Sequence, residues 1–452
     1  MIIRIGPIII PQWRQPSLYN ILCSAARVLA SQLSSVVSKL VNYSILTSTV
    51  PKVWLGAQIT PVPKITPPTA LSDFRPISVT SLLSRLTERI IVQDYLVPCL
   101  ESKLFEDQYA YKPTGSTTCA LVDFTHRIHC MLEINQYVRC VFIDFSKAFD
   151  MVDHPTLINK LSSLRVPLFI IKWLVSFLSG RTQTTFFNFL LSASATINRS
   201  IIQGSGIGPV LFIMFAHDLK ALDILNFLLK YADDATLLCP EHTNTSVEDE
   251  MSNIMNWARC NKLLLNMLKT EEMVFHRPNP RSIVYPVELD GIERVTEFRL
   301  LGVLFDSEFR FSKYINNLIT VCNQRLFLLT RLKKQGLGLP ETDTVFKAII
   351  FSKILYALPM LAGYFTENHL QQITSIFNKA RRWQLILTNF DIQSIIERTQ
   401  SDLFRRSKSS SHCLNHLYVP TINTRGHSFD IPRLRYSFNA NSFINRCLSL
   451  YK

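Results

Sequence analysis

Two apolar runs near the middle of the chain flank a pair of adjacent carboxylates. The residues from Ile224 to Leu229 are mostly apolar and predict a buried strand, and the run from Ala235 to Leu238 predicts its hairpin partner. Asp233 and Asp234 then fall at the tight turn between the strands. Because two neighbouring like charges repel each other, they cost stability unless a cation neutralises them. The pattern predicts a metal site at this turn, with a solvated turn as the alternative.

A second β-rich run, Val138–Ile143, ends abruptly at Asp144. A strand that carries an aspartate at its end, beside a hairpin that carries two more, can place three carboxylates around a pair of hard cations. Magnesium prefers oxygen ligands and shares its remaining positions with substrate phosphates, and Mn²⁺ is the alternative ion. Two such ions activate a hydroxyl and stabilise the leaving oxygen in phosphoryl transfer. The sequence therefore predicts a magnesium centre for that chemistry.

A glycine-rich loop lies between the two acidic segments. It comprises Gln203–Pro209 and is followed by the apolar run Val210–Phe215. Its three glycines let the backbone approach a ligand closely, and Pro209 favours the start of a helix. An ordinary loop before a core helix has the same pattern. The three features follow one another along the chain: a strand that ends in an aspartate, a glycine loop before a helix, and a hairpin with two aspartates. This order is much less expected by chance than any one of the features alone.

Three segments resemble the A, B and C motifs of reverse transcriptases, above all those of non-LTR retrotransposons of the jockey and chicken-repeat kind. The three segments are Phe142–Asp150, Gln203–Pro209 and Tyr231–Asp234. The resemblance runs from about residue 45 to about residue 390. Its further parts are the fingers motif in Ile59–Lys64 and Asp73–Ser78, motif D in Trp257, Leu263–Asn266 and Lys269–Glu271, and the primer-grip region in Leu300–Asp306.

The resemblance implies the following catalytic roles. Asp144 and Asp233 would hold two catalytic ions, Asp234 would complete the carboxylate cluster, and the carbonyl of Phe145 would add one ligand. Lys269 matches the motif D lysine, a candidate general acid for the departure of pyrophosphate. A solvated lysine at a helix end is the alternative for Lys269.

The resemblance also implies a set of nucleotide-binding residues. Phe149 matches the steric gate that rejects the 2′-hydroxyl of ribonucleotides. Lys64 and Arg75 match the basic fingers residues that grip the triphosphate, as their charge and donors suggest independently. Gln203 and Gly204 would contact the incoming nucleotide and the template base.

The fold implied by the resemblance is an α+β right-hand polymerase with fingers, a palm with an antiparallel sheet, and a helical thumb. We expect an N-terminal helical extension at residues 1–44 and fingers and palm at 45–305. A helical thumb is expected at 306–400, followed by a basic, less ordered tail at 401–452. Apolar residues at helical spacing support this layout. They are Val79, Leu82, Leu83, Leu86 and Ile90 after the fingers motif, and residues 315–329, 345–350 and 370–380 in the thumb.

The charge of the chain favours a nucleic-acid partner. The net charge is +14, with 48 Lys and Arg against 34 Asp and Glu. The basic excess is concentrated before Asp73, between Glu308 and Glu341, and beyond Ser401. Such stretches suit a phosphate backbone, with a merely basic protein as the alternative.

Cysteine usage argues against a secreted, disulfide-bonded protein, and hydropathy argues against a membrane-spanning one. The ten cysteines lie at irregular spacings without a Cys-x-x-Cys pair, which argues for reduced intracellular thiols rather than a secreted disulfide framework. The segment Ser411–His416 has one cysteine and two histidines, too few for a zinc knuckle, so no zinc site is expected. The apolar stretch Val166–Gly180 is short and contains Lys172, which favours a buried helix over a membrane span.

Taken with the resemblance, these features predict an RNA-directed DNA polymerase. It would extend a DNA 3′ end on an RNA template with dNTPs, acting in the nucleus by the habit of the family. The alternative is a decayed, non-catalytic nucleic-acid-binding remnant of the same kind of element. Only about fifty residues precede the fingers motif, so we expect no endonuclease domain. The pattern gives no indication of oligomeric state.

Overall fold

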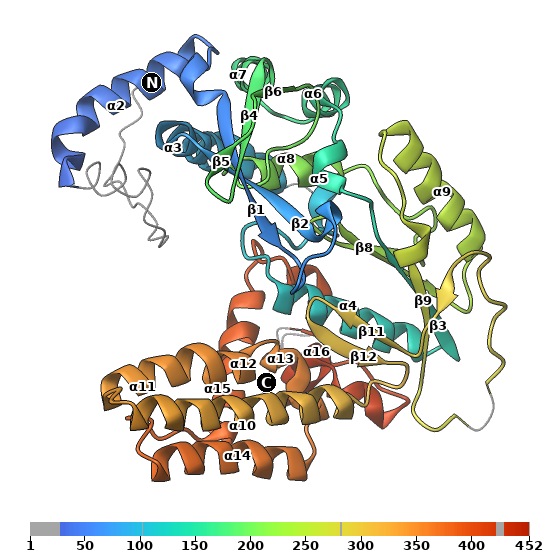
Figure 1. Cartoon of the computed structure of the whole chain (residues 1–452). Coiled ribbons are helices and arrows are strands. Elements are labelled where there is room, and N and C mark those ends of the chain that lie inside the picture. Colours follow the sequence, from blue (N-terminus) through green and yellow to red (C-terminus); the bar gives the residue numbers. More distant parts are fainter. Residues whose placement is uncertain (1–27, 102, 281–282, 422–428, 452) are drawn as a thin grey trace. The chain divides into compact units, whose positions relative to one another are not determined.

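The computed structural model forms two compact units (Figure 1). It describes residues 28–101, 103–280, 283–421 and 429–451. The first unit comprises Met1–Phe105, Phe145–Leu219 and Asn256–Leu264, and the second comprises Glu106–Asp144, Lys220–Met255 and Leu265–Lys452. The residues predicted as an N-terminal extension are described only from residue 28, and they enter helix α2 (Ala30–Leu46).

A five-stranded sheet forms the centre of the second unit. Its order is β10 (Glu293–Arg294), β9 (Glu271–His276), β3 (Tyr137–Ile143), β8 (Asp234–Pro240) and β7 (Phe227–Tyr231). β3 is antiparallel to both of its neighbours, and β7 and β8 form a hairpin. β3 is an almost continuous run of apolar and β-branched residues, and its residues from Val138 to Ile143 are all buried, which suits a strand that is covered on both faces. The predicted antiparallel sheet is therefore present.

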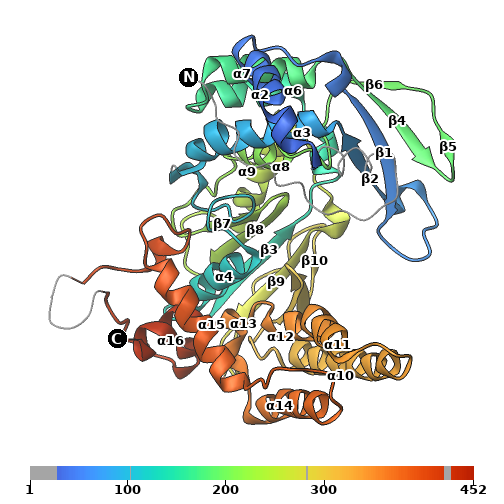
Figure 2. The same ribbon diagram turned by 90° about the vertical axis from the view of Figure 1, so that its left-hand side faces the viewer.

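Helix α4 (Thr117–Leu132) packs along this sheet, against β3, β7 and β8 (Figure 1, Figure 2). The fully buried ring of Phe124 lies 5.8 Å from that of Phe275 in β9 and 5.2 Å from that of Phe305, measured between centroids. Burial of such a side chain stabilises a fold by about 2–3 kcal/mol. The hydroxyl of Ser116 caps the helix by accepting a hydrogen bond from the Cys119 amide.

The rest of the second unit is mainly helical. It holds the β11–β12 hairpin (Glu297–Leu300, Val303–Asp306) and the helices α10 (Ser312–Lys334), α11 (Leu339–Phe346), α12 (Ser352–Leu355), α13 (Leu358–Leu361), α14 (Glu367–Arg382), α15 (Ile392–Ser407) and α16 (Phe443–Leu450). The helices predicted at 315–329 and 370–380 are confirmed as α10 and α14. Gly336, at φ +101°, follows the end of α10, and Pro340 lies in the first turn of α11, as the sequence indicated.

The described part of the tail beyond Ser401 contains a packed helix, which corrects the expectation of a less ordered segment. α15 continues to Ser407, and α16 buries Phe443, Ile444 and Cys447 in the core of the second unit. Apolar residues at helical spacing in α16 give this short segment a face to bury. The proposed domain boundaries themselves stay predictions.

A second sheet organises the first unit. It runs β2 (Phe74–Thr80), β1 (Gly56–Pro63), β4 (Arg181–Phe187) and β5 (Leu190–Leu191), with β6 (Ala195–Ile197) also paired to β4. The helices are α2, α3 (Leu82–Ile91), α5 (Ala148–Met151), α6 (His154–Ser163), α7 (Leu168–Leu178) and α8 (Gly208–Phe215), while α9 (Val247–Cys260) contributes residues to both units. α8 begins at the predicted place, with Pro209 in its first turn.

Two local predictions are wrong. β7 begins at Phe227, and Ile224 before it is 96% exposed, because the apolar run continues through a loop that precedes the strand. α3 forms as predicted, but Val79 lies in β2 and the fully buried side chains of the helix are largely polar. They are Ser84, Thr87, Glu88 and Ile91. Glu88 is buried because it binds backbone N–H groups of the glycine loop, a contact that apolar spacing cannot predict.

Helix α7 is the buried helix that the sequence predicted at 166–180. Trp173, Leu174 and Phe177 are at most 1% exposed. Within the described residues, no single helix has both the length and the apolar character to cross a membrane. One bent pair, Leu339–Leu355 with Leu358–Tyr364, meets that test by length and composition alone.

Candidate active site

Asp144, Asp233 and Asp234 meet at one edge of the central sheet of the second unit. Ile143, the last residue of β3, pairs with Ala235 in β8, so Asp144 and Asp234 are the next positions on adjacent strands. Tyr231 pairs with Asp234 across the hairpin, which leaves a two-residue turn of Ala232 and Asp233. Ala232 has φ +57°, as the first position of a tight hairpin turn requires. The three predicted carboxylates therefore come together.

Burial and neighbouring negative charge raise the pKa values of two of the three carboxyl groups. Burial, followed by the negative charges of Asp233 and Asp144, raises the pKa of Asp234 to about 6. Burial and the charge of Asp144 raise the pKa of Asp233 as well. Two carboxyl groups whose ionised forms are disfavoured by burial and by neighbouring charge, beside the carboxylate of Asp144, are a set of hard oxygen donors that a divalent cation would stabilise. The donor set therefore fits magnesium or manganese.

A short turn, residues 266–270, fixes Asp144. The Asn266 side-chain amide donates to Asp144 Oδ2 (2.9 Å), and the Asn266 backbone N–H donates to the Asp144 carbonyl (2.8 Å). The Asp144 N–H donates to Thr270 Oγ1 (3.4 Å), whose hydroxyl donates to the Asn266 carbonyl (3.0 Å). From the sequence, Asn266 and Thr270 were placed within motif D without an assigned role. Asn and Thr between an apolar run and a strand were the available signal.

The hairpin turn rests on a segment that sequence reasoning did not include. Gln108 is buried, and its side-chain oxygen accepts from the Ala232 N–H (3.1 Å). Asp107 forms ion pairs with Lys230 (3.2 Å) and with Lys220 (2.6 Å). The charge of Asp233 adds to burial in raising the pKa of Tyr111, which places the phenol near the cluster. Residues 107 and 108 therefore hold β7 and the turn that carries Asp233 in place.

The glycine loop is held rigidly in the first unit. The Gln203 side chain donates to Asp150 Oδ1 (2.9 Å), and its carbonyl accepts from the Ser78 N–H (2.8 Å). Gly204 has φ +102°, and a Cβ there would lie 2.6 Å from the Ser78 carbonyl oxygen, so only glycine fits. The buried Glu88 carboxylate accepts from the Gly206 N–H (2.7 Å). Burial raises the pKa of Glu88.

The other residues predicted to contact the nucleotide are Phe149, which packs on another ring, and Lys64 and Arg75, which are exposed. Phe149 stacks on Phe212 of α8, with ring centroids 4.5 Å apart. Lys64 is exposed at the end of the β1–β2 region, where its ammonium donates to the Ser72 carbonyl (2.9 Å). Arg75 is exposed on β2, in register with Val62 of β1.

The predicted residues are divided between the two units. The second unit holds Asp144, Asp233, Asp234 and Lys269, and the first unit holds Lys64, Arg75, Phe145, Phe149, Gln203 and Gly204. The structure brings together the three carboxylates. Lys269 is exposed, and its N–H donates to the Asn266 carbonyl (3.1 Å), so it belongs to the turn that holds Asp144.

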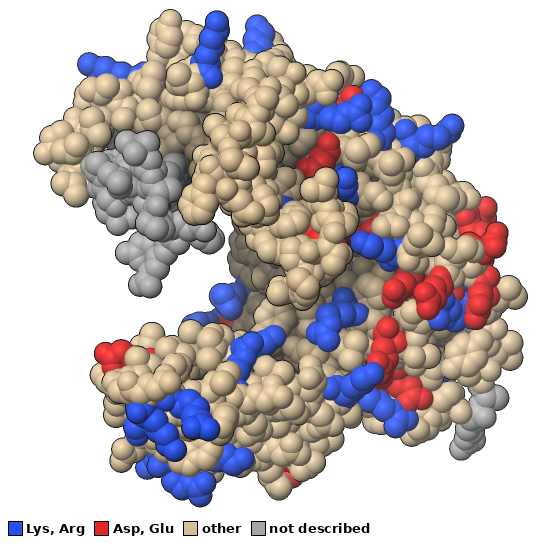
Figure 3. All heavy atoms as spheres, viewed as in Figure 1, with Lys and Arg blue, Asp and Glu red and all other residues tan. Residues whose placement is uncertain are grey.

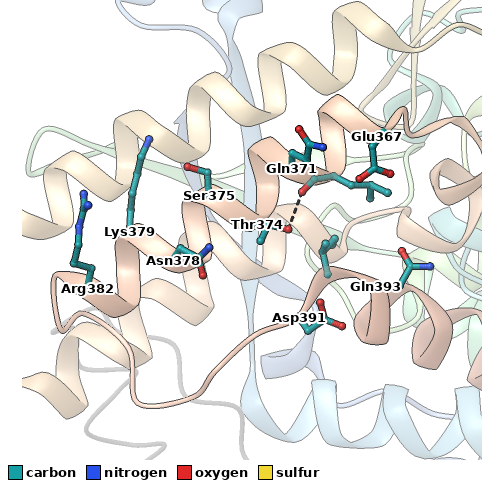
Figure 4. A pocket seen from close by; sticks show the side chains of 11 residues that line it. Glu367, Gln371, Thr374, Ser375, Asn378, Lys379, Arg382, Asp391 and Gln393 are labelled. Carbon is teal, nitrogen blue, oxygen red and sulfur yellow. Dashed lines mark hydrogen bonds between the residues drawn. The ribbon is translucent and has the colours of Figure 1, made fainter.

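A pocket of about 520 Å³ lies elsewhere, along α14 and the start of α15 (Figure 4). Most of the residues that line it are polar or charged, and they include Gln371, Asn378, Lys379 and Gln393. It contains none of the predicted site residues. The acidic edge of the sheet, and not this pocket, is the candidate active site.

An α+β fold with a carboxylate cluster at the end of its antiparallel sheet is the arrangement that the sequence predicted for a polymerase of the right-hand class. More specifically, the chain belongs to the reverse transcriptase family. Residues 62–305 match the family described as reverse transcriptase (RNA-dependent DNA polymerase). This membership confirms the predicted family and fold class, and it implies dependence on divalent metal.

Similar proteins come from mobile elements. The chain is 25% identical over 390 residues to the "Probable RNA-directed DNA polymerase from transposon BS" of Drosophila melanogaster, covering 82% of this chain and 43% of that protein. It is also 25% identical over 375 residues to the "RNA-directed DNA polymerase from mobile element jockey" of the same species, covering 79% of this chain and 40% of that protein. The chain thus spans less than half the length of these curated relatives.

A telomerase from Candida albicans, solved with a fragment of telomeric RNA, is 12% identical to the chain. The match covers 78% of this chain and 68% of that one, with a TM-score of 0.41. The family assignment rests on the sequence match.

Proposed function

We propose that the chain is an RNA-directed DNA polymerase of a non-LTR retrotransposon. It would extend a DNA 3′ end along an RNA template with dNTPs and release pyrophosphate. The observation that carries the proposal is the cluster of Asp144, Asp233 and Asp234 at a sheet edge in a chain of the reverse transcriptase family. The cluster supplies the acidic oxygen donors that this reaction needs.

The reaction is an in-line displacement at phosphorus. The primer 3′-oxygen loses its proton and forms a bond to the α-phosphorus of the dNTP, while the bond to the bridging oxygen of the β-phosphate breaks. Two Mg²⁺ ions, or Mn²⁺, would be held by the three aspartates and the Phe145 carbonyl. When bound, these ions activate the 3′-hydroxyl and neutralise charge on the leaving pyrophosphate. The turn at Asn266 keeps the Asp144 carboxylate in one orientation for this task.

The nucleotide would be selected and oriented by residues of the first unit. We assign Lys64 and Arg75 to the triphosphate, because both are exposed cations beside the β1–β2 pair. Phe149, fixed by its stacking on Phe212, would exclude a 2′-hydroxyl. The Gln203–Gly204 backbone, locked against Ser78, would support the base of the incoming nucleotide.

Lys269 is proposed as the general acid for pyrophosphate. It lies in the same short turn as Asn266, and the Lys269 N–H donates to the Asn266 carbonyl. This turn is tied to Asp144, so the ammonium belongs to a segment anchored at the acidic cluster. Proton donation to a departing phosphate oxygen is worth about 10²-fold or more in rate when well positioned.

The template and primer would bind to basic helices of the second unit. Lys and Arg side chains gather at the ends of α10 and α14, at the lower left of Figure 3. They are Arg331, Lys333, Lys334, Lys379, Arg381 and Arg382. Contacts of this kind are electrostatic and largely independent of base sequence.

The test is extension of a labelled DNA primer on an RNA template by the purified chain, with dNTPs and magnesium. The proposal predicts products that lengthen with time and disappear when magnesium is chelated. The same primer on a DNA template measures template preference. A chain that binds the primer–template duplex in a salt-sensitive way but never extends it would instead be the non-catalytic remnant.

A further inference from the structure

A second group of possible metal ligands lies in the second unit, apart from the three aspartates in kind and in sequence. The ligand atoms of Cys119, His412 and Cys413 all lie within 4.8 Å of one another. Cys119 belongs to the first turn of α4, and the other two belong to the loop that follows α15. The Cys119 and Cys413 thiols both donate to the Thr114 carbonyl, at 3.6 and 3.3 Å.

The backbone around these three side chains is held in place. Thr114 Oγ1 accepts from the Cys413 N–H (2.9 Å), and the Thr114 carbonyl accepts from the Cys413 thiol (3.3 Å). The Ser116 cap accepts from the Cys119 N–H (3.1 Å). The loop after α15 is therefore bound to the segment before α4 by a hydrogen bond from the Cys413 backbone N–H as well as by the sulfur contacts.

The three side chains are withdrawn from solvent. Cys119 is 2% exposed, Cys413 is 6% exposed and His412 is 9% exposed. His412 Nδ1 lies 3.9 Å from Cys413 Sγ and accepts a 3.2 Å hydrogen bond from the Leu414 N–H. A bound cation would take the imidazole lone pair in place of this long hydrogen bond.

We propose that Cys119, His412 and Cys413 form a binding site for a thiolate-preferring divalent cation of the zinc kind. Two thiolates and one imidazole are ligands that zinc prefers, and their two negative charges balance the ion. Three protein ligands leave a fourth position for water. Magnesium, which requires oxygen ligands, would not occupy this site.

The proposed site would tie the loop after α15 to the helix that packs on the catalytic sheet. α4 contacts β3 and β7, the strands that lead to Asp144 and Asp233. A cation bound to the folded chain stabilises it by mass action. The ligand set joins segments far apart in sequence, so the single cysteine of Ser411–His416 did not predict it. The proposal does not depend on polymerase activity.

The test is titration of the full reduced chain with Co²⁺, in excess magnesium and a phosphine reductant that does not itself bind the ion. Binding to thiolates produces an intense sulfur-to-cobalt charge-transfer absorption that carboxylate ligands cannot give. We expect this band to saturate at one cobalt per chain and to vanish when zinc is added. Zinc retained by the chain after purification, measured by elemental analysis, checks the site without any variant.

Variants identify the ligands. Cys119→Ser and Cys413→Ser should each lower the charge-transfer absorbance to about half or less, the double variant should abolish it, and His412→Gln should weaken cobalt binding at least about tenfold. The matched control is Cys260→Ser, because Cys260 is an exposed cysteine outside the cluster. Each variant is first checked for a native circular dichroism spectrum.

Three outcomes would overturn the proposal. The native chain could give no charge-transfer band, or the band could keep its native intensity in the Cys413→Ser variant. Alternatively, mass analysis of the non-reduced chain could reveal a Cys119–Cys413 disulfide in place of bound metal.

Discussion

Asp144 acts within a small hydrogen-bonded unit, and its neighbour Asn266 is the residue that determines its orientation. The Asn266 side chain binds the carboxylate while its backbone N–H binds the carbonyl of the same aspartate. A carboxylate held in one rotamer loses little further freedom when a cation binds. We therefore propose Asn266 as a positioning residue rather than a catalytic one.

Replacement of Asn266 should separate rate from nucleotide affinity. Asn266→Leu removes the hydrogen bond to Asp144 Oδ2, so we expect kcat for dNTP incorporation to fall about tenfold, with little change in KM for the dNTP. The magnesium concentration for half-maximal rate should rise. Asn256→Leu, at an exposed position of α9, is the control. An unchanged magnesium dependence in Asn266→Leu would contradict the positioning role.

Phe149 offers a test of substrate selection at a single side chain. The Phe149 ring stacks on Phe212. A smaller residue at position 149 therefore leaves open space beside Phe212. We expect Phe149→Val to raise incorporation of ribonucleotides relative to deoxyribonucleotides by about tenfold or more. Competing rNTP and dNTP in a single-nucleotide extension assay measures this ratio. A ratio equal to that of the native chain would exclude the gate.

At the scale of elements, buried polar groups in α4 govern how the second unit responds to acid. His129 is fully buried between Asn439 Oδ1 (2.8 Å) and the Tyr364 hydroxyl (2.7 Å). A neutral imidazole satisfies both partners, one nitrogen donating to Asn439 and the other accepting from Tyr364. Burial lowers the pKa of His129 to about 3.

This depressed pKa predicts a loss of stability in acid. In the unfolded state His129 has the ordinary histidine pKa of 6.5. As the pH falls below 6.5, the unfolded state therefore binds a proton that the folded state does not bind until the pH nears about 3. The stabilising effect of the neutral ring is complete above that pH and is lost as the pH falls toward about 3. Between those limits His129 contributes a slope of about 1.4 kcal/mol per pH unit to the free energy of unfolding.

The measurement is urea unfolding at several pH values for the native chain and His129→Gln. The variant should be less stable at neutral pH, because the hydrogen-bonded network is broken, but its stability should fall less steeply in acid. His242→Gln, at an exposed histidine, should keep the native slope. Equal slopes for the native chain and His129→Gln would contradict the prediction.

The elements show which features the sequence could predict. The strand before Asp144, the turn at Asp233 and helices α10 and α14 were all predicted, because local apolar spacing and turn residues determine them. The buried face of α3 was not, since Glu88 is held there by the loop at Gly206, far along the chain. Local patterns could not indicate a charge whose partner is supplied by tertiary structure.

In the candidate site, too, the sequence could predict what local patterns determine but not the contacts made by tertiary structure. The three aspartates could be predicted to meet because Asp144 follows a recognisable strand, Asp233 lies in a recognisable hairpin turn and Asp234 begins the next strand. Asn266 was within a recognised segment, but its bond to Asp144 is a long-range contact that periodicity does not encode. The grouping of Cys119 with His412 and Cys413 is likewise visible only in three dimensions.

At the scale of the whole molecule, the charge of +14 predicts salt-sensitive binding of nucleic acid. Arg381 and Arg382 are exposed at the end of α14. If both contact phosphates, the double replacement by alanine should weaken duplex binding for all sequences and reduce the slope of log affinity against log salt by about 2. Fluorescence anisotropy over a salt series measures this slope. A double variant with native affinity and slope would place the duplex elsewhere.

We propose that the acidic edge of the sheet performs metal-dependent DNA synthesis on RNA. The most direct measurement is the rate of single-nucleotide incorporation on an RNA template at saturating magnesium, for the native chain, Asp144→Asn and the exposed-site control Asp290→Asn. We predict a rate at least about 100-fold lower for Asp144→Asn alone, with duplex affinity unchanged. Incorporation by Asp144→Asn at the native rate would contradict the assignment of the active site.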